Sequence, residues 1–177
     1  MPEEKILEWF FSFPNSMIGL SELADKIKIS KTTANRKIKL LEKRKLLNIE
    51  IIGKSWRISP NIDNKQFFNL KLSYNLKKIY ESKIIDEINR EVPNSRAVIL
   101  FGSYRKGDDT EKSDVDIAVE VLSNEDLKIK TLKKINIGLR KNIPINLHIF
   151  SKKRIDLNLF SNIANGIVLD GFLEVKA

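Results

Sequence analysis

Two short motifs in the second half of the chain constrain its fold more than any other feature. Gly102-Ser103 directly follows an apolar run at 97–101, and Asp114 and Asp116 come after an interval of ten residues. The apolar run predicts a buried strand. A second strand is expected from Asp114 onward, where polar and apolar residues alternate. This alternation directs both carboxylates to one face of that strand.

The two aspartates would repel each other unless a cation lay between them. A site made of oxygen ligands suits Mg²⁺, which also binds substrate phosphates. The Gly102-Ser103 turn carries no side chain at its first position, so its backbone N–H groups and the Ser103 hydroxyl can approach a phosphate closely. The motifs therefore predict a site for Mg²⁺ and a nucleoside triphosphate. The alternative is an acidic surface loop that follows a buried strand.

This arrangement closely resembles the nucleotidyltransferase superfamily related to DNA polymerase β, and in particular its small stand-alone members. Gly107 and Ser113 also fall where the family's pattern has them, and the resemblance covers about 82–177. It implies transfer of a nucleoside monophosphate from a nucleoside triphosphate, with ATP expected, to a hydroxyl or phosphate. Two metal ions, Mg²⁺ or Mn²⁺, would assist. By this resemblance the nucleotide-binding residues are Gly102, Ser103, Arg105, Lys106, Gly107 and Ser113, although Arg105 and Lys106 can also be solvated loop bases.

The third carboxylate that the family usually carries on a later strand is missing. We expect a helix at about 125–141 and then a strand at 143–150, in which Asn146 takes the place of that acid. Asparagine is neutral, so it binds metal weakly and cannot act as a base. His148 projects to the same face, either as a base or ligand or as a hydrogen-bonded strand histidine. The expected metal ligands are Asp114, Asp116 and Asn146, and the expected catalytic residues are Asp114, Asp116 and His148.

The first 60 residues predict three helices and a hairpin, at 3–13, 20–27, 30–46 and 48–59. Ser30 is expected to cap the third helix. Between positions 31 and 45 there are seven basic residues and one acidic residue, a net charge of +6. Such a stripe is typical of a helix that binds nucleic acid, although a lysine-rich helix face can also simply be solvated.

This order of elements resembles a winged helix-turn-helix over about 3–59. In such domains the third helix enters the major groove of double-stranded DNA. By the resemblance, the residues that read bases are Lys31, Thr32, Thr33, Asn35 and Arg36. Those that contact phosphates are Lys39, Lys43, Lys54 and Arg57. The alternative is a winged helix that serves only protein contacts or dimerisation.

The middle of the chain connects these two parts. Residues 60–64 are polar and turn-like, and 65–91 has helical periodicity with a break near Glu81-Ser82. We therefore expect an α/β (α+β) protein with a mixed sheet flanked by helices. Its expected parts are a winged helix-turn-helix, a connecting helix and a minimal nucleotidyltransferase domain, at 1–60, 61–81 and 82–177.

Composition excludes several classes of protein. The chain has no cysteine, which excludes disulfides and thiolate metal sites. No apolar run approaches the ~20 residues of a membrane span, and the first residues lack the pattern of a signal peptide. We therefore expect a soluble, cytoplasmic protein. The net charge of +9 suggests a polyanionic partner.

Three functions remain open at this stage. Similar fusions, known mainly in archaea, are described as predicted nucleotidyltransferases or as regulators. The first hypothesis is an enzyme that transfers a nucleoside monophosphate to an unknown acceptor. Small family members act as antitoxins that adenylylate a HEPN-family toxin, so such a toxin is one candidate partner. The second is a DNA-binding transcriptional regulator, expected to be a homodimer, that binds nucleotide without catalysis. The third is a structural dimerisation module.

Overall fold

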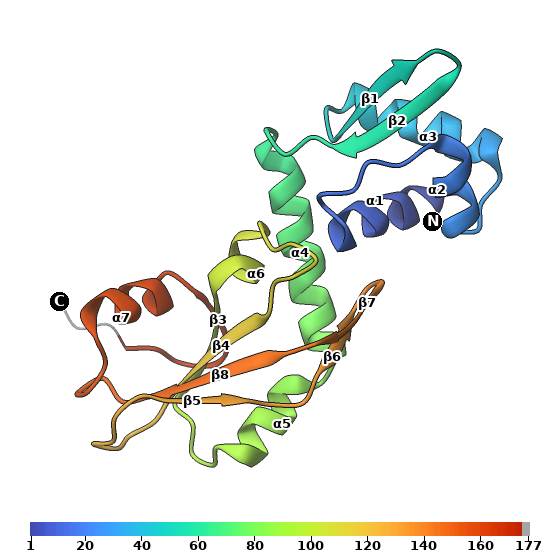
Figure 1. The fold of residues 1–177 in the computed structure, drawn as a ribbon. Helices are drawn as coiled ribbons and strands as arrows, with labels where there is room; N and C mark the ends of the chain where they lie inside the picture. Colours follow the sequence, from blue (N-terminus) through green and yellow to red (C-terminus); the bar gives the residue numbers. More distant parts are fainter. Residues whose placement is uncertain (175–177) are drawn as a thin grey trace. The chain divides into compact units, whose positions relative to one another are not determined.

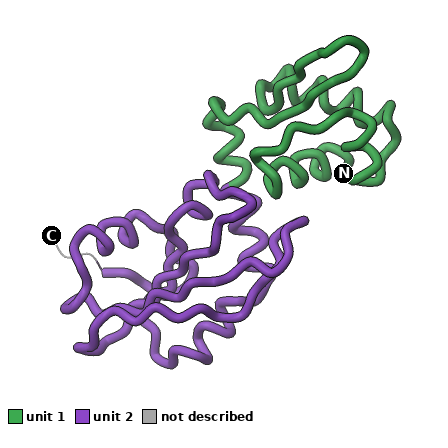
Figure 2. Tube along the Cα trace, in the orientation of Figure 1, with its two compact units in different colours: residues 1–71 green, residues 72–177 purple. Residues whose placement is uncertain are grey.

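A computed structural model describes residues 1–174 of the chain. They form two compact units that divide after Lys71, within a long helix (Figure 2). Each unit has its own core.

The first unit consists of three helices and a two-stranded hairpin (Figure 1). Its elements are α1 (Pro2–Ser12), α2 (Leu20–Lys26), α3 (Lys31–Lys43), β1 (Leu47–Ile52) and β2 (Ser55–Pro60), followed by the start of α4 (Lys65–Glu81). The predicted helices and hairpin are thus present. Ser30 caps α3 as expected, because its hydroxyl accepts a hydrogen bond from the Thr33 N–H at 3.2 Å.

The core of this unit lies under α3. Ala34, Ile38 and Leu41 recur at helical spacing and are fully buried, so the opposite face of the helix is left to its basic side chains. Strand β2 is anchored at its centre, where Ile58 pairs with Ile49 of β1 and forms a bridge to Ile18 on its other side.

The second unit is a sheet between helices (Figure 1). After the rest of α4, its helices are α5 (Ile84–Glu91), α6 (Gly102–Lys106) and α7 (Leu157–Ala164). Its strands are β3 (Ala97–Phe101), β4 (Val115–Glu120), β5 (Lys128–Thr131), β6 (Ile135–Ile137), β7 (Arg140–Ile143), β8 (Ile145–Phe150) and β9 (Ile167–Gly171). The break expected near Glu81-Ser82 is the gap between α4 and α5.

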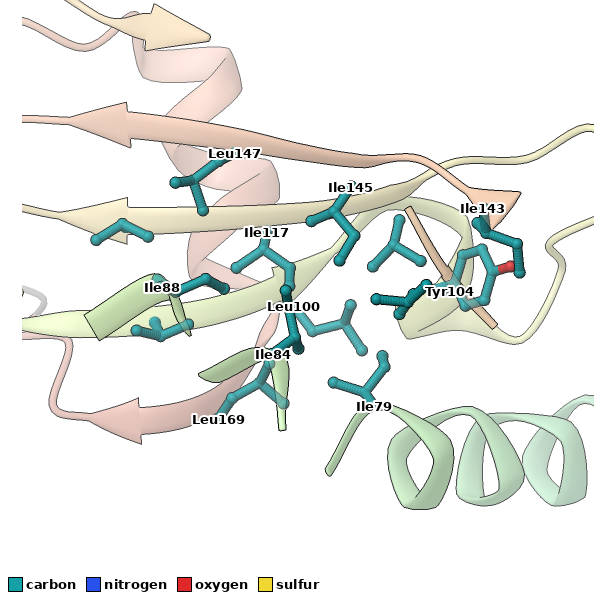
Figure 3. Close-up of a cluster of buried hydrophobic side chains, with 14 of the residues drawn as sticks. Ile79, Ile84, Ile88, Leu100, Tyr104, Ile117, Ile143, Ile145, Leu147 and Leu169 are labelled. Atoms are coloured by element: carbon teal, nitrogen blue, oxygen red, sulfur yellow. The ribbon is translucent and has the colours of Figure 1, made fainter. Parts of the chain in front are cut away.

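The main sheet is mixed, with strand order β5-β8-β4-β3-β9. Strands β4 and β8 are parallel, and β3 runs antiparallel to β4. One face of the sheet packs against α5 and the end of α4 in a large apolar cluster, which includes Ile84, Ile88 and Ile117 (Figure 3). The other face packs against α7 through Ala118, Phe150 and Ile163. The predicted mixed α/β class is therefore confirmed.

The helix predicted over 125–141 is wrong, because this segment forms β5 and the β6–β7 hairpin. Its isoleucines at 135 and 137 are separated by two, which is a strand period, and both are buried in the large apolar cluster. Gly138 has φ +59° at the first position of the two-residue turn, a conformation that favours glycine in a tight hairpin. Within residues 1–174, no helix is long and apolar enough to span a membrane.

Candidate active site

The pairing of β3 with β4 places the two sequence motifs side by side. Phe101, the last residue of β3, lies opposite Asp116 in the antiparallel register. The next residue, Gly102, has φ +72°, and a Cβ atom added there would lie 2.7 Å from the Asp116 Oδ2 atom. A side chain at this position would therefore force the Asp116 carboxylate to move, in addition to straining the backbone at a positive φ. The Gly-Ser turn therefore lies next to the acidic motif, as predicted, because the backbone of Gly102 packs directly against Asp116.

The neighbouring strand β8 brings Asn146 to the same place. Asn146 lies opposite Asp116 in the parallel β4–β8 register, and its Nδ2 atom donates to the Asp114 Oδ2 atom at 3.3 Å. Its Oδ1 atom accepts from the Thr131 hydroxyl at 3.3 Å. The three residues expected to bind metal are therefore brought together, and Asn146 is oriented by a neighbour on the edge strand β5.

His148 lies deeper along the same face. Its Nε2 atom is 3.5 Å from Asp116 Oδ1, and its side chain is only 14% exposed. Within residues 1–174 neither ring nitrogen makes a hydrogen bond, and the ring packs edge-on against Phe101 with the ring centroids 5.0 Å apart. At this distance the two groups form an ion pair only when the imidazole is protonated. The position suits a residue that stabilises Asp116 better than one that collects a proton from solvent.

The other residues expected to bind nucleotide lie in α6 and in the loop that follows it. Ser103 lies in the first turn of α6, and Gly107 ends that helix in the left-handed conformation. Lys106 is exposed, whereas Arg105 is half-buried and its Nε atom has no hydrogen-bond partner in the described part of the chain. Ser113 is already engaged, because its hydroxyl accepts from the Thr110 N–H at 2.9 Å.

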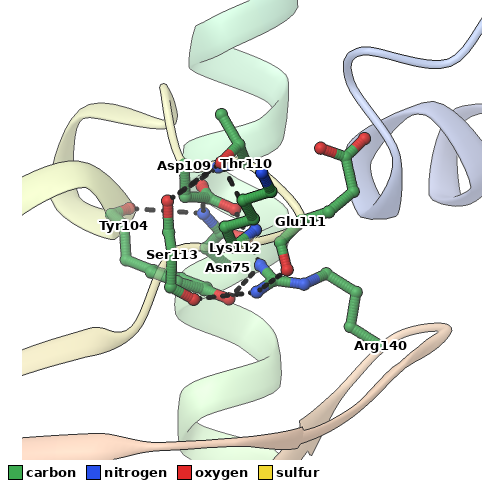
Figure 4. A network of polar contacts seen from close by, with 8 residues as sticks. All are labelled: Asn75, Tyr104, Asp109, Thr110, Glu111, Lys112, Ser113 and Arg140. Atoms are coloured by element: carbon green, nitrogen blue, oxygen red, sulfur yellow. Dashed lines mark hydrogen bonds and ion pairs between the residues drawn. The ribbon is translucent and has the colours of Figure 1, made fainter.

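A buried arginine, which sequence reasoning missed, holds the loop that carries Asp114 (Figure 4). Arg140 lies at the start of β7 and its side chain is 9% exposed. One guanidinium nitrogen donates to the Ser113 carbonyl at 2.8 Å and to the Glu111 carbonyl at 3.0 Å. Because Ser113 immediately precedes Asp114, these bonds fix the backbone from which the carboxylate projects.

The same network continues beneath the loop. The second guanidinium nitrogen of Arg140 donates to the Tyr104 hydroxyl at 2.5 Å and lies 3.6 Å from the buried Asp109 carboxylate. Asn75 of α4 donates to Asp109 at 2.6 Å and to the Tyr104 carbonyl at 3.3 Å. Burial raises the pKa of Tyr104 well above its ordinary value, so its phenol stays protonated. Loop 107–114 is thus fixed from α4, α6 and β7.

The donor set fits a divalent cation that is shared with substrate. Among residues 1–174 there is no group of three or more His, Cys, Asp or Glu side chains that could hold a metal alone. The site offers two carboxylates, while the Asn146 amide beside them turns its nitrogen to Asp114 and its oxygen to Thr131. Mg²⁺ commonly takes one or two carboxylates together with substrate phosphates and water. Asp116 is 30% exposed, so the cation can be reached from solvent.

Replacing Gly102 with alanine should disable this site. A Cβ atom would displace the Asp116 carboxylate, so we expect MgATP affinity to fall by roughly tenfold or more, as expected for loss of a charged contact. Gly53→Ala is the matched control, since Gly53 also has a positive φ (+60°) but none of residues 1–174 has an atom within 4 Å of the added one. Isothermal titration calorimetry with MgATP compares the two; equal affinities would contradict the packing described above.

The first unit presents a separate basic surface. Most of the predicted DNA contacts are exposed, namely Lys31, Thr32, Arg36, Lys39, Lys43, Lys54 and Arg57, while Thr33 and Asn35 are half-buried. The Thr33 hydroxyl accepts from Ser30 at 2.8 Å, so it belongs to the helix cap. Lys31, Asn35 and Lys54 line one pocket of about 430 Å³ between α2, α3 and the hairpin turn.

Comparison with known proteins bears on the second unit. A family model described as a nucleotidyltransferase domain matches residues 81–169, which is half of the chain. No curated protein matches the chain significantly. The matched segment begins at the end of α4 and contains Gly102, Asp114, Asp116 and Arg140.

Proposed function

Because the chain belongs to the nucleotidyltransferase domain family, we propose that it binds a nucleoside triphosphate, preferably ATP, with Mg²⁺ or Mn²⁺ at Asp114 and Asp116. We further propose that it transfers the nucleoside monophosphate to an acceptor hydroxyl or phosphate. The observation that supports this most strongly is the packing of Gly102 against Asp116. It sets the Asp116 carboxylate beside a small turn that can admit phosphates.

Each residue of the site has a distinct role in this proposal. Asp114 and Asp116 hold the cation, which neutralises phosphate charge and activates the acceptor oxygen when bound. Ser103 and the neighbouring backbone N–H groups bind the triphosphate tail. Asn146 supports Asp114 through its amide and contributes at most one neutral oxygen. His148 lies against Asp116 and keeps that carboxylate turned toward Gly102.

Transfer itself is tested by incubating the full chain with ATP labelled at the α-phosphate, with Mg²⁺ or Mn²⁺. Candidate protein and RNA acceptors are then examined for the label. Label on an acceptor, lost in the Asp114→Asn/Asp116→Asn variant, is the expected result. Absence of label on every acceptor, despite MgATP binding, would leave binding without catalysis as the function.

Restoring the missing acid should strengthen the metal site. In Asn146→Asp a third carboxylate replaces the amide beside Asp114, so we expect Mn²⁺ affinity to rise by roughly tenfold. Without metal this variant should be less stable than the wild type, because three carboxylates repel one another. Asn124→Asp adds the same charge at an exposed loop position and serves as the control. Mn²⁺ titration by electron paramagnetic resonance gives the affinity, and an unchanged value would argue against Asn146 as a neighbour of the metal.

A second candidate function is DNA binding by the first unit. The observation that favours it is the shared pocket of Lys31, Asn35 and Lys54 beside the exposed basic face of α3. An amide and two ammonium groups placed together suit contacts with a base edge and the adjacent phosphates. Under this proposal the chain is a transcriptional regulator whose nucleotidyltransferase domain binds nucleotide without catalysis.

Neutralising two exposed lysines should weaken DNA binding in a salt-dependent way. For Lys43→Gln/Lys54→Gln in the full chain we expect the slope of log K against log salt to fall by about 2. Lys5→Gln on α1 removes a charge outside this surface and should leave the slope unchanged. Fluorescence anisotropy with a duplex DNA at several salt concentrations measures the slope for each variant. Equal slopes for the double variant and the wild type would exclude this surface as the DNA contact.

A further inference from the structure

The basic surface of the first unit includes an aromatic side chain that the predicted DNA contacts leave out. Trp56 is the second residue of β2 and is half-buried. It lines the pocket of about 430 Å³ to which Lys31, Asn35 and Lys54 also belong. A base pair that stays stacked in a duplex presents only its edge in a groove, whereas an unstacked base also offers its face to an aromatic ring.

The Trp56 ring lies on the side of the hairpin that faces the helices. Trp56 and Ile58 are two positions apart in β2, so their side chains project from the same face, and Ile58 is fully buried. The ring is also held from α3, because the Lys39 Nζ atom lies 5.6 Å from the ring centroid. Asn35 lies one turn before Lys39 on the same face of α3, which places its amide next to the ring.

The polar groups of the pocket are those that recognise a nucleotide. Asn35 is half-buried, and its amide offers both donors and an acceptor to the edge of a base. Lys31 and Lys54 are exposed and line the pocket from α3 and from the hairpin turn, where their ammonium groups can neutralise phosphate. Among the described residues of the lining, two lysines against one acid, Glu22, leave a net positive charge.

The size of the pocket and the charge around it suit one base of a longer strand. Its volume lies near the lower end of the roughly 300–1,000 Å³ of small-molecule sites. Exposed Arg36 and Lys43 of α3 and Arg57 of β2 extend the positive surface beyond the pocket. Proteins that bind single strands combine such a surface, which follows the backbone, with aromatic rings on which bases stack.

We propose that this pocket binds an unstacked base of single-stranded DNA, with the base stacked on Trp56 and its edge bonded to Asn35. Lys31 and Lys54 contact the flanking phosphates, and the basic face of α3 follows the rest of the strand. This proposal rests on the second proposed function, DNA binding by the first unit, and specifies the form of DNA that is bound.

The fluorescence of Trp56 provides the test. The chain has two tryptophans, so Trp9→Phe in the full chain leaves Trp56 as the only one. This variant is titrated with an oligothymidine of about ten nucleotides, with a GC-rich duplex of the same length and with thymidine monophosphate. The expected result is saturable quenching by oligothymidine, with roughly tenfold weaker binding of the duplex and of the monophosphate.

Three results would contradict the proposal. Oligothymidine that binds without quenching Trp56, or a duplex that binds as tightly, would overturn the base pocket but leave DNA binding by the first unit standing. Failure of both DNA probes to bind would overturn the pocket and DNA binding together. Equal affinities for the monophosphate and the oligothymidine would overturn the strand as the ligand.

Two variants locate the strand at the pocket, with binding followed by the anisotropy of a labelled oligothymidine. Trp56→Ala should weaken binding roughly tenfold, the effect of one lost base–aromatic stack. Ile52→Ala is the control, because it truncates a half-exposed side chain on the opposite face of the hairpin. If Trp56→Ala does not fold, Asn35→Ala decides, since alanine favours the helix and loss of the amide should weaken binding roughly fivefold. Unchanged affinity in whichever of the Trp56 and Asn35 variants folds would refute the site.

Discussion

Replacing Arg140 with methionine is expected to lower the free energy of unfolding of the second unit by about 3–5 kcal/mol, the range for breaking a buried ionic network. The side chain is 9% exposed and makes three hydrogen bonds, to the Tyr104 hydroxyl and to the carbonyls of Glu111 and Ser113. Methionine fills a similar volume but donates nothing. The two carbonyls lose charged donors, and buried Asp109 loses the cation at 3.6 Å.

Urea denaturation followed by circular dichroism measures this effect. Lys141→Met is the matched control, because it removes a positive charge from the next, exposed position of β7 and should change stability by less than about 0.5 kcal/mol. Arg140→Lys keeps the charge but loses the forked geometry, so an intermediate loss is expected. A loss below about 1 kcal/mol in Arg140→Met would contradict the role given to this network.

Where Arg140→Met still folds, it should also disturb the nucleotide site. Hydrogen exchange at the amides of 111–114 should become faster than in the wild type, since the carbonyls of this loop are no longer held. This readout requires no ligand. Unchanged exchange together with a large loss of stability would mean that Arg140 supports the core and does not position Asp114.

The sequence could predict that the Gly-Ser turn and the two acids lie near each other, because these residues are close together along the chain. Gly102, Asp114 and Asp116 belong to one strand–turn–strand segment, and period-two alternation is sufficient to place both acids on one face. Asn146 could also be placed, since β8 shows the same alternation. For the turn and the two acids a local pattern and a short connection determine the geometry, whereas Asn146 reaches them through the parallel pairing of β8 with β4.

Arg140 and Asn75 could not be predicted because their partners are distant in the chain and the local patterns are weak. Arg140 follows a two-residue turn inside the segment for which the sequence predicts a helix, and only the pairing of β6 with β7 directs it into the loop. Asn75 lies in a helix whose polar residues look solvated in the sequence, although it is 1% exposed. The isoleucine spacing and Gly138 were the signals that could have revealed the hairpin.

Neutralising both aspartates should abolish metal-dependent nucleotide binding. In Asp114→Asn/Asp116→Asn the cation loses both charged ligands, so we expect MgATP affinity to fall by a factor of about 100 or more, as two charged contacts are lost. Metal-free ATP should bind no worse to this variant than to the wild type, because two negative charges that repel the triphosphate are removed. The variant should therefore lose the difference between MgATP and ATP, and this distinguishes a metal site from a general loss of structure.

Isothermal titration calorimetry of the full chain with ATP, in Mg²⁺ and then in chelator, tests the central claim most directly. Asp108→Asn/Asp126→Asn, which neutralises two exposed acids, serves as the charge-matched control. The account predicts Mg²⁺-dependent binding in the wild type and the control, and its loss in the Asp114/Asp116 variant. A folded wild-type chain that binds no MgATP, or a variant that binds it equally well, would contradict a metal–nucleotide site at these aspartates.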